Sequence, residues 1–251
     1  MRCACCALAR VGGVQAGNDG VMWPQDADAL VVAQEDLALA SPEPWVPRDG
    51  WALVGGCWVC FPHGLTGPGD RGDPAWAAAV VMRGRSVAET HVLQGVAGGP
   101  YQPGLLALRI GPLMEWAVRS LESTPGVLLL DATGRDHPRR AGLAVHLGAV
   151  LDLPTVGVTH RPLVAKGLWP SDSRGAVSAL RIGNEVVACW VRTRAGARPL
   201  VVHPGWRVDL PTAVRLVLAA TGRRRTPEPL RRARQAARVA RRDASADYRP
   251  G

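Results

Sequence analysis

The sequence has few of the features that mark a membrane protein or a secreted one. It contains no run of about eighteen apolar residues, so we expect no membrane-spanning helix. Residues 1–14 lack the long apolar region of a secretory signal, which favours a cytoplasmic protein. Lysine occurs once, at Lys166, and aromatic residues other than tryptophan are scarce, with one phenylalanine and two tyrosines.

A disulfide framework is also not indicated by the six cysteines. Cys57 and Cys60 are spaced as CxxC, but they lie inside an apolar stretch that is typical of a strand. Alternation along a strand points two such side chains to opposite faces, which does not suit a shared zinc ion. We therefore expect buried thiols.

Positive charge is abundant, and nearly all of it comes from arginine. The net charge is +9 and the isoelectric point is about 10.2, which favours a polyanionic partner such as DNA or RNA. Residues 223–242 are rich in arginine, with apolar residues at helical spacing. This helix is expected either to bind phosphates or to form an ordinary solvated face.

The centre of the chain has the pattern of a strand, a helix and a second strand. Residues 127–130 are apolar and end at Asp131, and a helical pattern begins at Pro138. Residues 155–158 then form another apolar stretch. This order predicts a parallel crossover unit with Asp131 at the carboxyl end of a strand, where open α/β sheets bind ligands.

The rest of the chain predicts a single α/β domain over residues 21–243. Residues 1–20 are expected to be a disordered extension and residues 244–251 a tail. We expect three antiparallel strands followed by parallel strands, flanked by helices. The patterns predict helices at 26–40, 105–121 (interrupted at Gly111-Pro112), 211–220 and 223–242, and further strands at 51–61, 75–82, 86–92, 177–192 (a hairpin) and 199–203.

The stretch from Asp131 to Val158 resembles the endonuclease V family. The matching pattern is D-x-x-G-x-x-HPRR-x-G-x-A-x-H-x-G-x-x-x-D-x-PT-x-GV. Similar matches outside it include Pro100–Gly104 and the PEP at 227–229. The resemblance implies a ribonuclease H-like fold, Mg²⁺ as cofactor, and cleavage of the phosphodiester to the 3′ side of inosine in DNA or RNA. We expect a monomer.

The resemblance also implies a catalytic set of four positions, and only one of them is retained. Asp131 matches the family's strand-end aspartate, a metal ligand. Cys57, Ile110 and Trp206 stand where the family has aspartate, glutamate and histidine. Because two-metal hydrolysis needs several carboxylates at one point, the site is expected to be impaired. The side chains that we consider as replacement ligands are Glu115, Asp136 and His203.

The positions that would bind substrate are better kept. By resemblance, a wedge that stacks an aromatic ring where a base leaves the helix is formed by Pro100, Tyr101, Gln102, Pro103 and Gly104. Gly134 would allow close approach of a base. His137 and Arg139 would contact phosphate or orient the loop, unless they are a solvated helix start. His160 replaces a lysine of the family, and His146 lies mid-helix, where a hydrogen-bonded core histidine is common.

Three functions are compatible with this sequence. The first is a catalytically impaired endonuclease V homologue that still binds nucleic acid. The second is an active, Mg²⁺-dependent, inosine-directed endonuclease that uses replacement ligands. The third is a non-catalytic scaffold or a decayed homologue.

Overall fold

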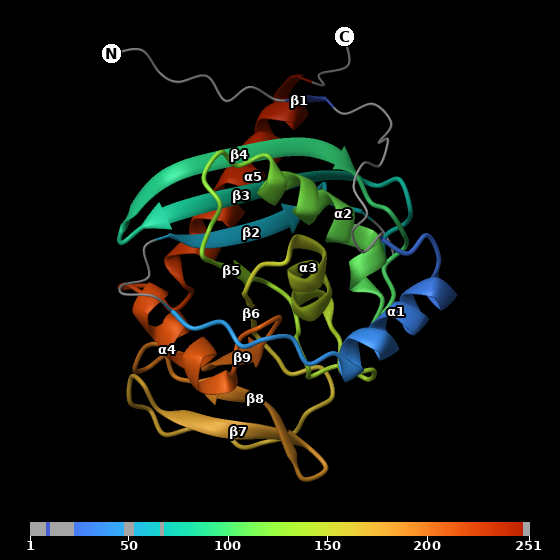
Figure 1. The fold of residues 1–251 in the computed structure, drawn as a ribbon. Coiled ribbons are helices and arrows are strands. Elements are labelled where there is room, and N and C mark those ends of the chain that lie inside the picture. The colour runs from blue at the N-terminus through green and yellow to red at the C-terminus, as the bar shows by residue number, and fades with distance from the viewer. Residues whose placement is uncertain (1–8, 11–22, 48–52, 66–67, 248–251) are drawn as a thin grey trace.

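A computed structural model describes residues 9–10, 23–47, 53–65 and 68–247 (Figure 1). A nine-stranded sheet forms its centre, in the order β1-β4-β3-β2-β5-β6-β9-β8-β7. The strands are β1 (Ala9–Arg10), β2 (Val54–Cys60), β3 (Pro74–Arg83), β4 (Ser86–Val96), β5 (Val127–Leu130), β6 (Thr155–Thr159), β7 (Val177–Ile182), β8 (Glu185–Val191) and β9 (Leu200–Pro204). In the described part of the chain, no helix is both long and apolar enough to span a membrane.

The sheet is mixed, as predicted, and it has the ribonuclease H-like plan. Strands β2, β3 and β4 form an antiparallel meander. Strand β5 then pairs parallel to β2, and β6 pairs parallel to β5. The parallel part ends there, because β9, β8 and β7 continue the sheet as antiparallel neighbours.

Helices cover both faces of the sheet, and the alternation of β5 shows how. Leu128 and Leu130 point into a core shared with α2 (Leu106–Arg119) and α3 (Leu143–Leu151). Val127 and Leu129 point into the opposite core, which contains side chains of α4 (Leu210–Ala220) and α5 (Glu228–Asp247). Helix α1 (Ala27–Leu39) packs against α3 and α2 rather than on the sheet (Figure 1).

Two helix predictions differ from the structure. Helix α2 is not interrupted at Gly111-Pro112. Gly111 instead allows close packing, because a Cβ atom there would lie 2.3 Å from the ring of Trp23. Helix α3 begins at Leu143 and not at Pro138. Residues 131–142 form a compact loop, in which Gly142 N–H donates to the carbonyl of Gly134 (2.9 Å).

Both predicted ends of the domain fall partly outside the described residues. Most of the extension predicted at 1–20 lies there, but Ala9–Arg10 forms β1 and pairs with Leu93 and Gln94 of β4. At the other end, α5 continues through the predicted boundary at 243 to Asp247, and residues 248–251 are not described.

Candidate functional site

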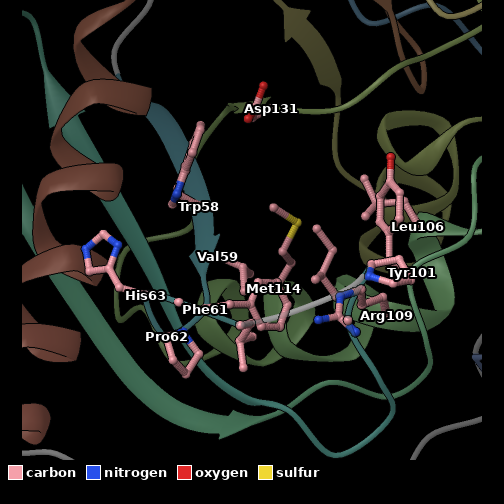
Figure 2. A pocket seen from close by; sticks show the side chains of 15 residues that line it. Trp58, Val59, Phe61, Pro62, His63, Tyr101, Leu106, Arg109, Met114 and Asp131 are labelled. Atoms are coloured by element: carbon pink, nitrogen blue, oxygen red, sulfur yellow. The ribbon is translucent and has the colours of Figure 1, made fainter.

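Asp131 directly follows β5 and lies beside the end of β2. The residue before it, Leu130, pairs with Cys57 of β2. Asp131 lines a cavity of about 470 Å³ whose wall also includes Trp58, Ile110 and Tyr101 (Figure 2). A second cavity, of about 180 Å³, shares Asp131 and Tyr101 with the first. The strand end therefore opens onto two hollows, as expected for a ligand site in this kind of sheet.

A positive charge acts on Asp131 from an arginine that the sequence analysis did not single out. Burial raises the pKa of the Asp131 carboxyl to about 6, and the positive charge of Arg234 on α5 opposes that rise. The Arg234 guanidinium carbon lies 5.1 Å from the centroid of the Trp58 ring. Its Nε atom is buried and has no hydrogen-bond partner. The signal for this residue was the helical spacing within 223–242, which does not say which arginine faces the sheet.

The other two positions at the strand end supply no oxygen ligand. The Cys57 thiol is fully buried and contacts the carbonyl of Met114 (3.9 Å). Burial raises the pKa of Cys57 to about 12, so this thiol is neutral. Ile110 is 7% exposed and lines the larger cavity. The thiol lies in the core with Leu130 and Met114 rather than in the wall of the cavity that Asp131 lines. Magnesium prefers oxygen ligands, so a lone carboxylate beside an isoleucine does not fit it.

The replacement ligands considered from sequence are engaged elsewhere. Glu115 accepts hydrogen bonds from Trp23 Nε1 (2.6 Å) and Arg119 Nε (2.7 Å). His203 is fully buried on β9, with its Nε2 atom 2.9 Å from Thr159 Oγ1. Across the ranges that the structure describes, no three side chains of His, Cys, Asp or Glu gather closely enough to hold a metal ion.

Asp136, the remaining candidate, has a structural task. It is fully buried and accepts three backbone hydrogen bonds, from Leu163 (2.7 Å), Val164 (2.9 Å) and Ala165 (2.7 Å). These bonds tie the loop after β5 to the loop after β6. Because both of its oxygens are used in this way, Asp136 is not free to bind a cation at Asp131.

Trp206 is not brought together with Asp131. It follows β9, which runs antiparallel to β6, so that Pro204 pairs with Val156 near the start of β6. The Trp206 N–H donates to Thr155 Oγ1 (2.8 Å), and its ring packs in a cluster with α1 and α3. Asp131 follows the other end of these strands. The fourth position of the catalytic set therefore lies near the start of β6, at the opposite end of the central strands from Asp131.

The turn that resembles a wedge stands at the mouth of both cavities. Tyr101 is 46% exposed and lines each of them. Its backbone N–H donates to the carbonyl of Gly69 (2.9 Å), while Gln102 and Pro103 are exposed. Gly104 has a φ of +81°, a conformation that glycine adopts without strain. An exposed ring on a fixed turn is suited to stacking against a base.

His137 and Arg139 hold this turn in place. The carbonyl of Gly104 accepts hydrogen bonds from Gln34 Nε2 (3.1 Å) and Arg139 Nη2 (3.0 Å), and His137 Nε2 lies 3.0 Å from it. The Arg139 backbone N–H donates to His137 Nδ1 (3.2 Å). Burial lowers the pKa of His137 to about 4, so its ring is neutral with the proton on Nε2. Both residues thus connect the loop after β5 to the wedge, and neither is a solvated helix start.

Gly134 and His160 have different surroundings. A Cβ atom on Gly134 would lie 2.1 Å from the carbonyl oxygen of Pro204, so backbone packing against β9 requires glycine there. His160 is exposed on the Asp131 side of the sheet, close enough to Arg225 and Arg234 for their charges to lower its pKa together with partial burial. The structure therefore brings His160 near the strand end and gives Gly134 a packing role.

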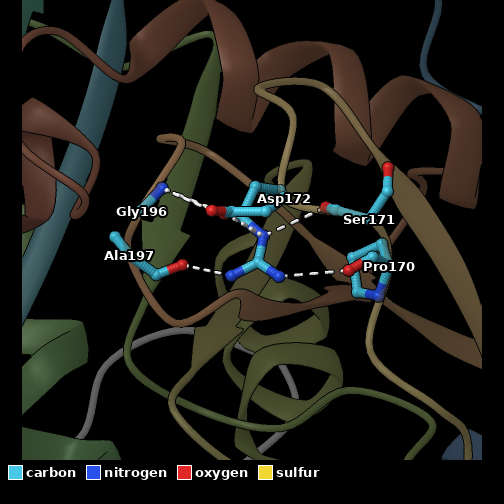
Figure 3. Close-up of polar contacts among 6 residues, drawn as sticks. Pro170, Ser171, Asp172, Gly196 and Ala197 are labelled. Carbon is cyan, nitrogen blue, oxygen red and sulfur yellow. Dashed lines mark hydrogen bonds and ion pairs between the residues drawn. The ribbon is translucent and has the colours of Figure 1, made fainter.

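A clamp around Arg192 shapes the loop at residues 161–175. Arg192, which is 7% exposed, donates to the carbonyls of Pro170 (3.1 Å), Ser171 (3.2 Å) and Ala197, and pairs with Asp172 (3.3 Å) (Figure 3). The loop carries the side chains of Leu168 and Trp169 outward, 87% and 54% exposed.

A ribonuclease H-like sheet with a carboxylate at the end of a central strand, next to an aromatic wedge, defines a protein of the nuclease class. The sequence model of the Endonuclease V family matches residues 46–235, and the chain belongs to this family. It is similar to the Endonuclease V of Streptomyces coelicolor, with 38% identity over 229 residues that cover 89% of this chain and 94% of that protein.

Solved structures agree with this assignment. The crystal structure of the Endonuclease V of Streptomyces avermitilis has a TM-score of 0.79 and 35% identity, over 89% of this chain and 96% of that one. The Endonuclease V of Ciona intestinalis, in complex with a 24mer DNA that contains an inosine followed by a ribo-adenosine, shares the fold (TM-score 0.73, 22% identity, 86% and 98% covered).

Proposed function

We propose that this protein binds inosine-containing nucleic acid at the Asp131 site and cleaves it weakly or not at all. The observation that carries the proposal is the set of side chains at the strand end. Asp131 is accompanied in the cavity by Trp58 and Ile110, and the charge that acts on it is the cation Arg234, while the neutral thiol of Cys57 lies in the core with Leu130. Two divalent ions need several carboxylates at one point, and here the charge next to the single carboxylate is positive.

Retention of binding is supported by the wedge. Tyr101 is exposed beside both cavities, and the turn that carries it is fixed at Gly104 by Gln34, His137 and Arg139. A base that leaves a duplex loses stacking worth about a few kcal/mol, and an aromatic ring at the mouth of a pocket restores part of it. The related Ciona protein was solved with inosine-containing DNA, which is the ligand class that we propose here.

The test measures binding and cleavage separately. Fluorescence anisotropy would compare a labelled inosine strand with the same strand carrying adenosine, first in EDTA and then in Mg²⁺. Gel analysis of the Mg²⁺ samples would report any nick. We expect tighter binding of the inosine strand in both buffers and little nicking. Rapid Mg²⁺-dependent nicking, abolished in Asp131→Asn, would establish the active endonuclease instead.

A role as a scaffold without nucleic-acid binding is the remaining candidate. The net charge of +9 and the exposed wedge disfavour it. Tyr101→Ala separates the two, with Val186→Ala as a control, because Val186 is exposed on β8 away from the cavities. We expect Tyr101→Ala to weaken binding of the inosine strand about tenfold, in line with the stacking energy of about 1–3 kcal/mol per base.

A further inference from the structure

Helix α5 carries three arginines close to the segment 58–63, which forms part of the wall of the Asp131 cavity. Arg234, Arg238 and Arg241 are spaced i, i+4 and i+7, so they form one stripe along the helix. We call these three residues the arginine row. The helix packs against β2 and β3, and the row lies along the edge of that contact.

Two members of the row contact residues of the cavity wall. Arg234 lies over the ring of Trp58. Arg241 donates to the carbonyl of Phe61 (3.0 Å) and contacts His63 Nε2. Trp58, Phe61 and His63 all line the 470 Å³ cavity together with Asp131 (Figure 2). Arg234 and Arg241 thus lie against residues of one wall, and Arg234 is the one whose charge reaches Asp131.

Two members of the row, Arg234 and Arg238, are outside the ion pairs of the described residues. Burial lowers the pKa of Arg238, and repulsion by Arg234 and Arg241 lowers it further. Asp131 is the one acid whose pKa Arg234 shifts by its charge. Because like charges crowded at a cavity favour an anion, this wall is prepared for a negatively charged ligand.

We propose that the arginine row binds the phosphates of a nucleic-acid strand, and that its own positive charge acts there in place of a divalent metal. Arg234 supplies a fixed positive charge at the strand end, and Arg238 and Arg241 extend it along the path of the backbone. Guanidinium groups suit this task, because they stay charged and bind phosphate oxygens in a planar, two-pronged geometry. The inference rests on the proposed function, and it assigns to the guanidinium groups the charge that a metal ion would supply at the Asp131 site.

The test is the salt dependence of binding in EDTA, measured by anisotropy with a labelled single strand. Each phosphate contact adds about 0.7 to the slope of log affinity against log salt for a single strand. We expect Arg234→Gln to lower the slope by about 0.7 and to weaken binding about fivefold to tenfold at low salt. Arg234→Lys should keep most of the slope, because it keeps the charge.

Arg232→Gln is the matched control, since it removes the same charge from the opposite side of α5, where Arg232 is 43% exposed and near Glu228. An unchanged slope in Arg234→Gln, an equal loss in Arg232→Gln, or binding that appears only with Mg²⁺ would each overturn the inference. Inorganic phosphate as a competitor shows whether the row recognises phosphate alone. The preference for inosine over adenosine in the native protein tests the proposed function separately, because the two strands carry the same phosphates and differ only in one base.

Discussion

His146 provides a quantitative test of the packing around α3. Its ring is fully buried and stacks on Trp23, with the centroids 4.6 Å apart and the planes at 11°. Neither ring nitrogen has a hydrogen-bond partner. Burial lowers the pKa of His146 to about 4, so the folded protein keeps the ring neutral in conditions where the unfolded chain protonates it. The folded state therefore loses stability as the pH falls.

The size of this loss follows from the two pKa values. They are 6.5 in the unfolded chain and about 4 in the folded one. The effect begins as the pH falls through the unfolded value and stops growing below the folded value, because both states are then protonated. At pH 5 it amounts to about 2 kcal/mol of the free energy of unfolding, relative to neutral pH. His146→Leu has no such group, so the variant should be less sensitive to acid by that amount.

Urea unfolding near neutral pH and at about pH 5 measures the difference. The change in packing caused by leucine is the same at both pH values and cancels, as do the contributions of other histidines. Val145→Ala on the same helix is the control, because it shortens a buried side chain and should lose equal stability at both pH values. If native protein and His146→Leu lost the same stability on acidification, the account of a neutral, unpartnered imidazole would be refuted.

Three further predictions concern the site. Arg109→Met removes a 4% exposed side chain that donates to two carbonyls and an aspartate, so urea unfolding should show a loss of about 3 kcal/mol. Asp136→Asn replaces an acceptor of three backbone N–H groups, and should cost about 2 kcal/mol with faster hydrogen exchange at 163–165. The combined change Trp58→Asp, Ile110→Glu and Arg234→Gln replaces two residues of the cavity wall by carboxylates and removes a cation near Asp131, so Mg²⁺ should raise the melting temperature of this variant and not that of the native protein. No thermal shift in a folded triple variant would contradict the proposed cause of the poor metal site.

The fold was predictable because apolar periodicity and turn residues determine it locally. Strand β5, its terminal Asp131 and the hairpin around Gly84 were predicted within a few residues. The start of α3 was not, because Pro138 is a good first helical residue but the buried Asp136 holds its neighbours in a loop instead. Contacts of this kind join residues that are far apart in the sequence, so no local pattern predicts them.

The site was predictable only in part, because its members come from distant segments. The turn at Tyr101 and the strand end were found from motifs. Trp206 was assigned to the site by its place in a motif. Because β9 runs antiparallel to β6, however, Trp206 lies near the start of β6, at the opposite end of the strands from Asp131. Arg234 was one of many arginines in a helix, and only the packing of α5 shows which of them faces Asp131.

The close contact at Gly134 explains why a motif can outlast the chemistry with which it is associated. A Cβ atom at Gly134 would collide with the backbone of Pro204, and one at Gly157 would lie 2.2 Å from the carbonyl oxygen of Ala132. Any substitution there is opposed by the assembly of the sheet, whatever the protein binds. By contrast, Ile110 lines a cavity, so its side chain has open space on one side. Selection for a folded chain alone would therefore preserve the glycines of this signature but not the carboxylates. A match to the signature then reports the ancestry of such a chain rather than its activity.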